Sequence, residues 1–227
     1  MGSDPTLLAF DTSAAHCAAA LLSGGQIRAM AFDEMARGQA ERLMPLLEEV
    51  LTEAGLGWGD LDALGVGTGP GNFTGIRISV AAARGLALAR GIDAIGVSGF
   101  DVLRGLAGAP EMGALAVHLP GPRDGRYWQD YRNGLPEGAP LYEREGRAPP
   151  EPGATLLGPE AEPLARAWGA GHAAHDAQLT WPEAIAELAR IAAQRAATGA
   201  PGPRAAPLYV RPADAAPSRE AGPVILT

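Results

Sequence analysis

The residues best suited to chemistry form a glycine-rich stretch, residues 67–77, that reads Gly-Thr-Gly-Pro-Gly-Asn-Phe-Thr-Gly-Ile-Arg. Four glycines at the start of a helix leave several backbone N–H groups accessible, and such groups bind anions together with the helix dipole. The spacing is neither G-x-G-x-x-G nor a P-loop, and Pro70 lacks an N–H donor. The alternative is a rigid connector whose glycines let a strand and a helix pack tightly. The residues alone leave both interpretations open.

A second group of functional side chains, Asp11-Thr12-Ser13, ends the first apolar run of the chain. In folds of the actin, hexokinase and Hsp70 type, the equivalent hairpin presents an aspartate and nearby amides to ATP phosphates and a metal ion. Ala14 and Ala15 follow, so this turn has less backbone freedom to wrap a phosphate. The residues favour the simpler interpretation, a tight turn in which Asp11 and Ser13 bond local amides.

Other catalytic chemistries find little support. All 18 basic residues are arginine, which excludes a Walker-A loop and a Schiff-base lysine. His172 and His175 lie in an Ala/Gly-rich stretch, where a solvated loop is favoured over a metal site. Residues 96–100 lack the final glycine of a nucleophile elbow. Cys17, the one cysteine, lies in an apolar run and is predicted to be a buried thiol in a reducing compartment. We predict no catalytic residue, metal or cofactor.

Charge and hydropathy narrow the function classes further. The 227 residues carry a net charge of −8, which argues against a broad nucleic-acid-binding face. No apolar run approaches the length of a membrane span and no signal peptide is predicted, so we expect a cytosolic protein with no membrane contact. Three arginines interleave with three aromatic residues between positions 123 and 132. This cluster is interpreted as the arginine-rich edge of a hairpin rather than a surface that stacks on RNA bases.

The first hundred residues carry a clear pattern of elements. Apolar runs at 6–10, 16–22 and 26–32 are joined by tight turns and predict a three-stranded meander. A helix is predicted over 40–54 from apolar residues on one face: Leu43, Leu46, Leu47, Val50, Leu51 and Ala54. Strand 61–66, helix 76–90, strand 92–97 and helix 100–106 follow. Strands first, then strands alternating with helices, predict an α/β fold with a mixed sheet.

The second half has a fainter pattern that again begins with strands. We predict strands at 114–119, 126–132 and 140–145, and a short apolar segment at 155–158. Thr180-Trp181-Pro182-Glu183 matches a capping box that would begin a helix ending near residue 198. The proline-rich tail holds apolar islands at 208–210 and 224–226. A cut near 107–113 divides the chain into an N-terminal lobe, 1–108, and a reduced C-terminal lobe, 109–227.

Three stretches together resemble the TsaB (YeaZ) family of bacterial accessory subunits. They are F-D-T-S at 10–13, G-Q-A-E-R-L-M-P-L-L at 38–47 and G-V-G-T-G-P-G-N-F-T-G-I-R at 65–77; P-L-Y-V-R-P at 207–212 also resembles the family. The resemblance covers residues 7–103 and is thin over 107–199, where the family's Asp-Ala-Arg after a strand is missing. It implies an actin-like ATPase-type (hexokinase/Hsp70-like) fold of two lobes with mixed sheets, the second reduced.

The same resemblance implies a role in tRNA threonylcarbamoyladenosine synthesis. Such chains are paralogues of the catalytic subunit TsaD, whose metal-binding H-x-x-x-H motif is absent here: the corresponding positions are Gln39, Arg42 and Leu43. The resemblance implies a non-catalytic scaffold that pairs with a TsaD-like subunit, while a TsaE-like ATPase docks on the pair and a TsaC-type enzyme supplies threonylcarbamoyl-adenylate. tRNA contact would be indirect. The alternative is a stand-alone enzyme of this fold, a glycoprotease-like metallopeptidase or a small kinase.

Two sets of site residues follow. A vestigial nucleotide loop is expected at Asp11, Thr12, Ser13, Gly69, Gly71, Asn72, Thr74 and Gly75. The helix at 76–90 is apolar on more than one side, so a partner is expected to cover the side turned away from the sheet. We predict a four-helix contact with TsaD or with a second copy, through Leu43, Leu47, Arg77, Ser79, Ala82, Ala83 and Leu86. The alternative is that the second lobe covers this side.

Overall fold

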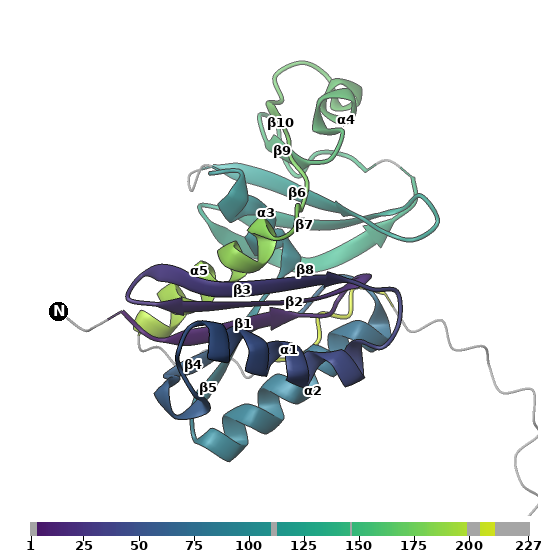
Figure 1. Ribbon diagram of the computed structural model, residues 1–227. Coiled ribbons are helices and arrows are strands. Elements are labelled where there is room, and N and C mark those ends of the chain that lie inside the picture. The colour runs from purple at the N-terminus through teal and green to yellow at the C-terminus, as the bar shows by residue number, and fades with distance from the viewer. Residues whose placement is uncertain (1–3, 110–112, 146, 199–204, 212–227) are drawn as a thin grey trace, which may run out of the picture.

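The chain folds into two lobes, each built on a five-stranded sheet (Figure 1). The structure is a computed structural model, and it describes residues 4–109, 113–145, 147–198 and 205–211. The first sheet has the order β3-β2-β1-β4-β5. Its strands are β1 (Leu7–Asp11), β2 (His16–Ser23), β3 (Gln26–Glu34), β4 (Ala63–Gly67) and β5 (Asp93–Val97). The first three pair antiparallel, while β4 and β5 run parallel to β1, so the predicted mixed sheet is confirmed.

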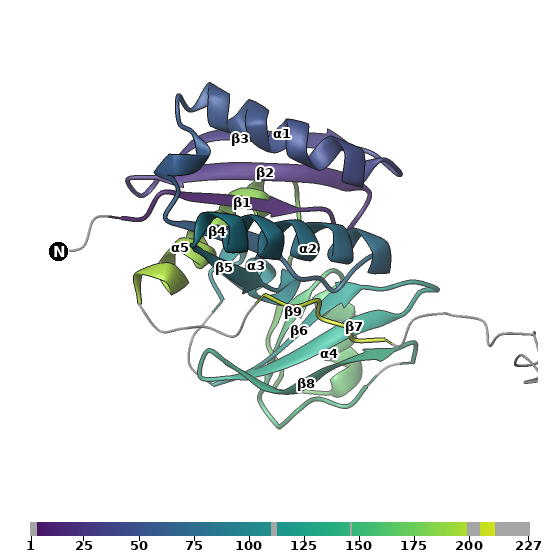
Figure 2. The same ribbon diagram turned by 90° about the horizontal axis from the view of Figure 1, so that it is seen from below.

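Helices cover both faces of the first sheet. On one face lie α1 (Gln39–Glu53) and α2 (Phe73–Arg90), seen together in front of the sheet in Figure 2. The apolar positions of α1 at three- and four-residue spacing are buried against β2, as the periodicity predicts. The opposite face holds α3 (Gly99–Leu106) and α5 (Glu183–Ala197). Because both faces are covered, β1 is buried throughout. A short 3₁₀ helix, Trp58–Asp60, precedes β4.

The second sheet has the order β10-β9-β6-β7-β8. Its strands are β6 (Ala114–Pro120), β7 (Arg126–Arg132), β8 (Leu135–Glu143), β9 (Thr155–Gly158) and β10 (Ala174–Asp176). The helix α4 (Ala161–Trp168) packs on β9 and β10. The predicted strands at 114–119 and 126–132 are confirmed, but the strand predicted at 140–145 begins earlier, at Leu135, and ends at Glu143. The helix α4 and the strand β10 were not predicted because each is short.

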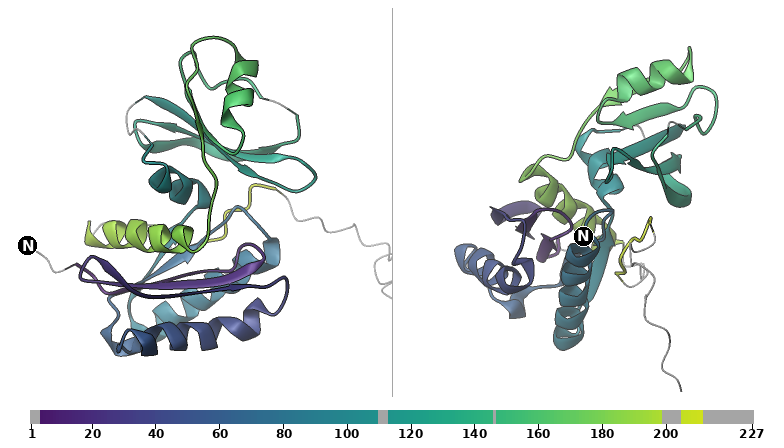
Figure 3. Two further views of the ribbon diagram at one scale, coloured as in Figure 1. Left: turned by 45° about the horizontal axis from the view of Figure 1, so that its top comes forward. Right: turned by 90° about the vertical axis from the view of Figure 1, so that its right-hand side faces the viewer.

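Two details of the sequence prediction are corrected. The helix α5 has Pro182 as its N-cap residue and no side-chain capping bond, so the capping box at 180–183 is wrong. In addition, α5 packs on β1, β2 and β4 of the first sheet, although it follows the second sheet in sequence. Figure 3 shows the chain descending from the upper lobe into this helix. The division at residue 108 stays a prediction, and the island at 224–226 lies outside the described residues.

A half-buried carboxylate joins the lobes. Asp101 of α3 accepts hydrogen bonds from Tyr131 of β7 (2.8 Å) and from Arg195 of α5 (2.8 Å). It also accepts one from the hydroxyl of Ser98 (2.9 Å). Burial alone would raise the pKa of Asp101, but the bonds and positive charge of Arg195, with those of the two hydroxyls, lower it. One ionised side chain therefore connects the second sheet to both helices on the inner face of the first.

Within the described residues, no helix is long and apolar enough to cross a membrane.

Candidate functional site

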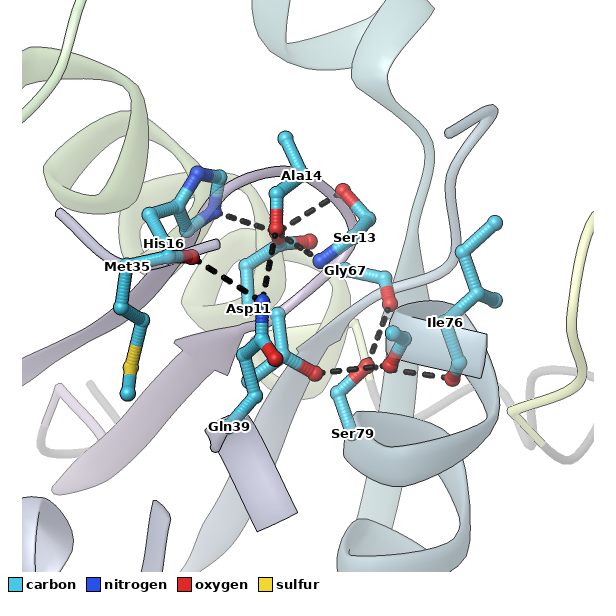
Figure 4. Close-up of polar contacts among 11 residues, drawn as sticks. Asp11, Ser13, Ala14, His16, Met35, Gln39, Gly67, Ile76 and Ser79 are labelled. Carbon is cyan, nitrogen blue, oxygen red and sulfur yellow. Dashed lines mark hydrogen bonds and ion pairs between the residues drawn. The ribbon is translucent and has the colours of Figure 1, made fainter. Parts of the chain in front are cut away.

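The turn after β1 meets the glycine-rich loop after β4, and we call this contact the loop junction: residues 11–16 and 67–76. At its centre the buried carboxylate of Asp11 accepts three hydrogen bonds on one oxygen (Figure 4). The donors are the amide of Ser13 (2.7 Å), its hydroxyl (2.8 Å) and Nε2 of His16 (2.8 Å). The turn is therefore held by its own side chains, as the tight-turn interpretation predicts.

The two loops approach so closely that only glycine fits between them. The Thr12 hydroxyl donates to the Gly75 carbonyl (2.7 Å), and the Asn72 amide donates to the Ser13 carbonyl (2.6 Å). A methyl group on Gly75 would overlap the Thr12 carbonyl oxygen, and one on Gly71 would overlap that of Ser13. Backbone of the first hairpin thus occupies the space beside the glycines.

The amides at the start of α2 are also engaged. The side-chain oxygen of Asn72 accepts from the amides of Thr74 (2.9 Å) and Gly75 (3.0 Å). The amide of Ile76 donates to the Asn72 carbonyl (2.9 Å). A phosphate at this helix terminus would have to displace the asparagine cap. The geometry favours the connector interpretation over the anion-binding one.

Gly69 has a different role within the loop. It has a positive φ of 93°, and its carbonyl accepts a hydrogen bond from the Gly99 amide (2.8 Å). The neighbouring Thr68 amide donates to the Val97 carbonyl (3.0 Å). This end of the loop is thus fixed to β5 and to the start of α3 rather than to the hairpin, and a residue with a side chain would be strained there.

His16 belongs to the site, although sequence reasoning did not single it out. Its ring is 3% exposed, and it packs on Trp181 with ring centroids 4.0 Å apart. It thus links the loop junction to the segment that leads into α5. No local pattern marks this role, because the partners Asp11 and Trp181 are brought together only by the fold.

The second predicted site, the outer face of α1 and α2, requires a correction in its residues. Leu43, Leu47, Ser79 and Ala83 are buried in the first lobe's own core and do not reach the surface. The exposed side of α2 instead carries Arg77, Ala81, Arg84, Gly85 and Leu88, with Ala82 and Leu86 half-buried beside it. Leu88 is 87% exposed, and Met44 of α1 is 40% exposed. The periodicity predicted two apolar sides of α2 but not which one faces the sheet.

The arginine and aromatic cluster at 123–132 and the histidine pair His172 and His175 take part in contacts within the second lobe. Tyr127, Trp128 and Tyr131 are all buried, so the strand does not present a row of stacking rings; this supports the hairpin-edge interpretation. His172 Nδ1 lies 3.1 Å from the Ala154 carbonyl oxygen, and His175 is an exposed residue of β10.

Cys17 is fully buried as predicted, and burial raises the pKa of its thiol to about 11. Among the described residues, no group of three or more His, Cys, Asp or Glu side chains is arranged to hold a metal ion.

The fold defines the class of protein: two α/β lobes of the actin-like ATPase type. The ROK hexokinase of Thermus thermophilus shares this fold, with a TM-score of 0.55 and 15% identity over 86% of this chain and 100% of that one. A solved Pseudomonas aeruginosa protein, described as similar to peptidase YeaZ, matches with a TM-score of 0.69 and 28% identity. That match covers 91% of this chain and 100% of the other.

Sequence comparisons lead from the class to a family. The model of the TsaD family, tRNA N6-adenosine threonylcarbamoyltransferase, matches residues 33–134. The tRNA threonylcarbamoyladenosine biosynthesis protein TsaB of Escherichia coli K12 is 40% identical over 92 residues, 40% of this chain and 39% of that protein. The match thus spans about two fifths of this curated relative. The chain is thus similar to the TsaB (YeaZ) family, in sequence over 40% of its length and in structure over 91%.

Proposed function

We propose that this chain is a non-catalytic scaffold that pairs with a TsaD-like subunit for threonylcarbamoyl transfer to tRNA in the cytoplasm. In this proposal a TsaE-like ATPase docks on the pair, and tRNA is contacted only through the partner. The names of the relatives support the pathway, since TsaB of E. coli is called a tRNA threonylcarbamoyladenosine biosynthesis protein.

The observation that carries the proposal is the exposed apolar side of α2. On this side Leu88 is 87% exposed, together with Ala81 and Gly85 and on the same side as Arg77 and Arg84, so an apolar side chain and small residues lie open to a partner helix. The small residues allow a partner helix to approach closely. The stretch that matches the TsaD family, residues 33–134, includes both α1 and α2, so a TsaD-like partner would carry a corresponding helix pair. Like helices then pack against like, as in a two-fold dimer.

The loop junction supports the non-catalytic part of the proposal. The hairpin is hydrogen-bonded directly to the glycine-rich loop, through the Ser13 carbonyl and the Thr12 hydroxyl, and Asn72 occupies amides that would face a phosphate. We therefore propose that Asp11, Thr12, Ser13 and the loop residues 69–75 are a vestigial nucleotide loop that now stabilises the first lobe.

The test is co-purification with the TsaD of the same organism, followed by size-exclusion chromatography with and without ATP. We expect a heterodimer, and we expect Leu88→Arg to weaken it at least tenfold without lowering the melting temperature, because the new charge would be buried at the contact. Leu135→Arg is the matched control, since Leu135 of β8 is 71% exposed on the other lobe.

If Leu88→Arg leaves the heterodimer intact, the interface lies elsewhere. A homodimer of the free chain through the same helices would be disrupted by the same substitution, and it would exclude TsaD. Tight binding of Mg-ATP or a metal by the isolated chain, with turnover, would instead favour a stand-alone kinase or metallopeptidase.

A further inference from the structure

A segment that follows α5 in the sequence returns to the start of α2. Residues 205–211, which we call the strap, run between α2 and the second sheet in Figure 2. The Leu208 amide donates to the Thr68 carbonyl of the first lobe (2.9 Å), while the side chains of Leu208 and Val210 pack against the apolar cluster of α3, β6 and β7. Tyr209, between them, packs on Phe73 at the start of α2, with ring centroids 5.1 Å apart. The strap therefore contacts both lobes.

The strap also holds one arginine of α2 in place. The guanidinium carbon of Arg77 lies 3.7 Å from the Phe73 ring centroid and 5.5 Å from that of Tyr209. In addition, Arg77 Nε donates a hydrogen bond to the Tyr209 hydroxyl (2.7 Å). An arginine that is fixed beforehand loses less side-chain entropy when it binds a partner. The strap thus preorganises an arginine on the surface of α2.

The terminal nitrogens of Arg77 remain available to another molecule. Among the described residues Arg77 forms no ion pair, and its hydrogen bond to Tyr209 uses Nε. Guanidinium groups bind carboxylates through paired N–H donors in a defined geometry. Tyr209 is itself 48% exposed, so part of its ring lies open beside this guanidinium. Tyrosine and arginine are among the residues that contribute most to protein–protein binding.

Arg77 begins the exposed side of α2 that the proposed scaffold uses for its partner. Positions 77, 81, 84, 85 and 88 follow one stripe of a helix. The exposed residues of α2 include no acidic residue and three arginines: Arg77, Arg84 and Arg90. Those of α1 include no arginine and four glutamates: Glu41, Glu48, Glu49 and Glu53. A contact between like helix pairs places α2 against the first helix of the partner, so this charge pattern favours a partner helix that carries carboxylates.

We propose that the strap is part of the surface that binds the TsaD-like subunit, and that Tyr209 positions Arg77 to pair with a carboxylate of that subunit. The exposed ring of Tyr209 extends the contact beyond α2. The proposal rests on the scaffold function and adds a second segment of the chain to its interface. A protein carboxylate is favoured over an RNA phosphate because the same stripe carries Ala81, Gly85 and Leu88.

The test is the dissociation constant of the heterodimer with the TsaD of the same organism, measured by biolayer interferometry on the full chain at about 0.05 M and about 0.5 M NaCl. Arg77→Ala should weaken the heterodimer about tenfold at low salt and less at high salt, because salt screens the charge pair. Tyr209→Phe keeps the ring but removes the hydroxyl that accepts from Arg77, so it should weaken the heterodimer about threefold. In the Arg77→Ala background, Tyr209→Phe should have no further effect.

Arg166→Ala is the matched control. The side chain of Arg166 is 74% exposed on α4, which lies at the opposite end of the molecule from α2 in Figure 1. Its loss should leave the dissociation constant unchanged at both salt concentrations. Thermal melts should show that all of these variants stay folded.

The outcomes separate this proposal from the scaffold function. If the wild-type chain forms no heterodimer, the scaffold function fails and this proposal fails with it. If Leu88→Arg disrupts the heterodimer but Arg77→Ala and Tyr209→Phe do not, the scaffold function stands and the role of the strap is overturned.

Three further results would overturn parts of the proposal. An effect of Arg77→Ala that is equal at both salt concentrations would exclude the carboxylate pair. Additive effects of the two substitutions would exclude positioning by Tyr209. If the isolated chain binds tRNA and Arg77→Ala removes this binding while the heterodimer is unchanged, the arginine binds RNA phosphate instead.

Discussion

The loop junction of the first lobe and the outer face of the second sheet differ in whether their buried polar side chains are hydrogen-bonded. At the loop junction three donors converge on one oxygen of Asp11, and Thr12 bonds the backbone of α2. On the outer face of the second sheet, five buried side-chain atoms have no hydrogen-bond partner among the described residues. They are Nδ1 and Nε2 of His118, Nε1 of Trp128, Oδ1 of Asp130 and one terminal nitrogen of Arg147.

The difference follows from what packs against each region. Glycines bring two backbones together at the loop junction, so carbonyl and amide groups lie within reach of the side chains. The outer face of the second sheet is covered by α4, which packs there through Ala161 and Ala165, and alanine side chains have no polar groups. The His118 ring packs on Trp128, with centroids 4.9 Å apart, rather than on an acceptor. These atoms of the second sheet therefore lack the partners that backbone and neighbouring polar side chains supply at the loop junction.

The largest expected effect is a test of close packing at the loop junction. Gly75→Ala should lower the free energy of unfolding by about 3 kcal/mol, because the added methyl overlaps the Thr12 carbonyl oxygen. Gly85→Ala on the same helix has open space around it and should instead raise stability by about 0.5–1 kcal/mol. Urea denaturation of both variants measures the contrast. Equal effects at the two positions would show that the loops do not meet as described.

A second prediction concerns the unpaired imidazole. Burial lowers the pKa of His118 to about 4, and Arg126 adds to this. An unfolded imidazole binds a proton below about pH 6.5. Because the native state does not bind this proton until about pH 4, stability falls as the pH drops from 6.5 towards 4.

Replacing this side chain should remove that dependence. His118→Leu should raise the free energy of unfolding by about 1 kcal/mol at pH 7 and by about 3 kcal/mol at pH 5. Denaturation curves at the two pH values measure it. His175→Gln is the control, since His175 is exposed. A variant whose stability keeps the wild-type pH dependence would show that His118 already has a partner, such as a bound water.

The fold class could be predicted from the sequence because apolar residues recur at regular helix and strand spacing in the first lobe. Leucines at helical spacing placed α1, and short apolar runs placed β1 to β4. The sequence did not predict which side of α2 faces the sheet, because alanine is equally compatible with a buried side and an exposed side. The packing of α5 on the first sheet was missed for another reason: its partners are strands more than 100 residues earlier. Likewise, the contact of His16 with Trp181 depends on that long-range return of the chain.

The smallest expected effect concerns Asp101, the paired carboxylate that joins the lobes. Asp101→Asn keeps the shape of the side chain but removes the charge that pairs with Arg195. We expect it to lower the free energy of unfolding by about 1.5 kcal/mol at pH 7. Because the pKa of Asp101 is lowered in the folded protein, this contribution is fully present above the unfolded pKa of about 3.9. It disappears as the pH falls through the lower folded pKa, so the stabilities of variant and wild type should converge in the acid range below that pKa. Urea denaturation at pH 7 and in this acid range measures both, with exposed Asp93→Asn as the control. A stability gap that persists in acid would mean that the side chain acts through its shape, and that the lobes are held together without its charge.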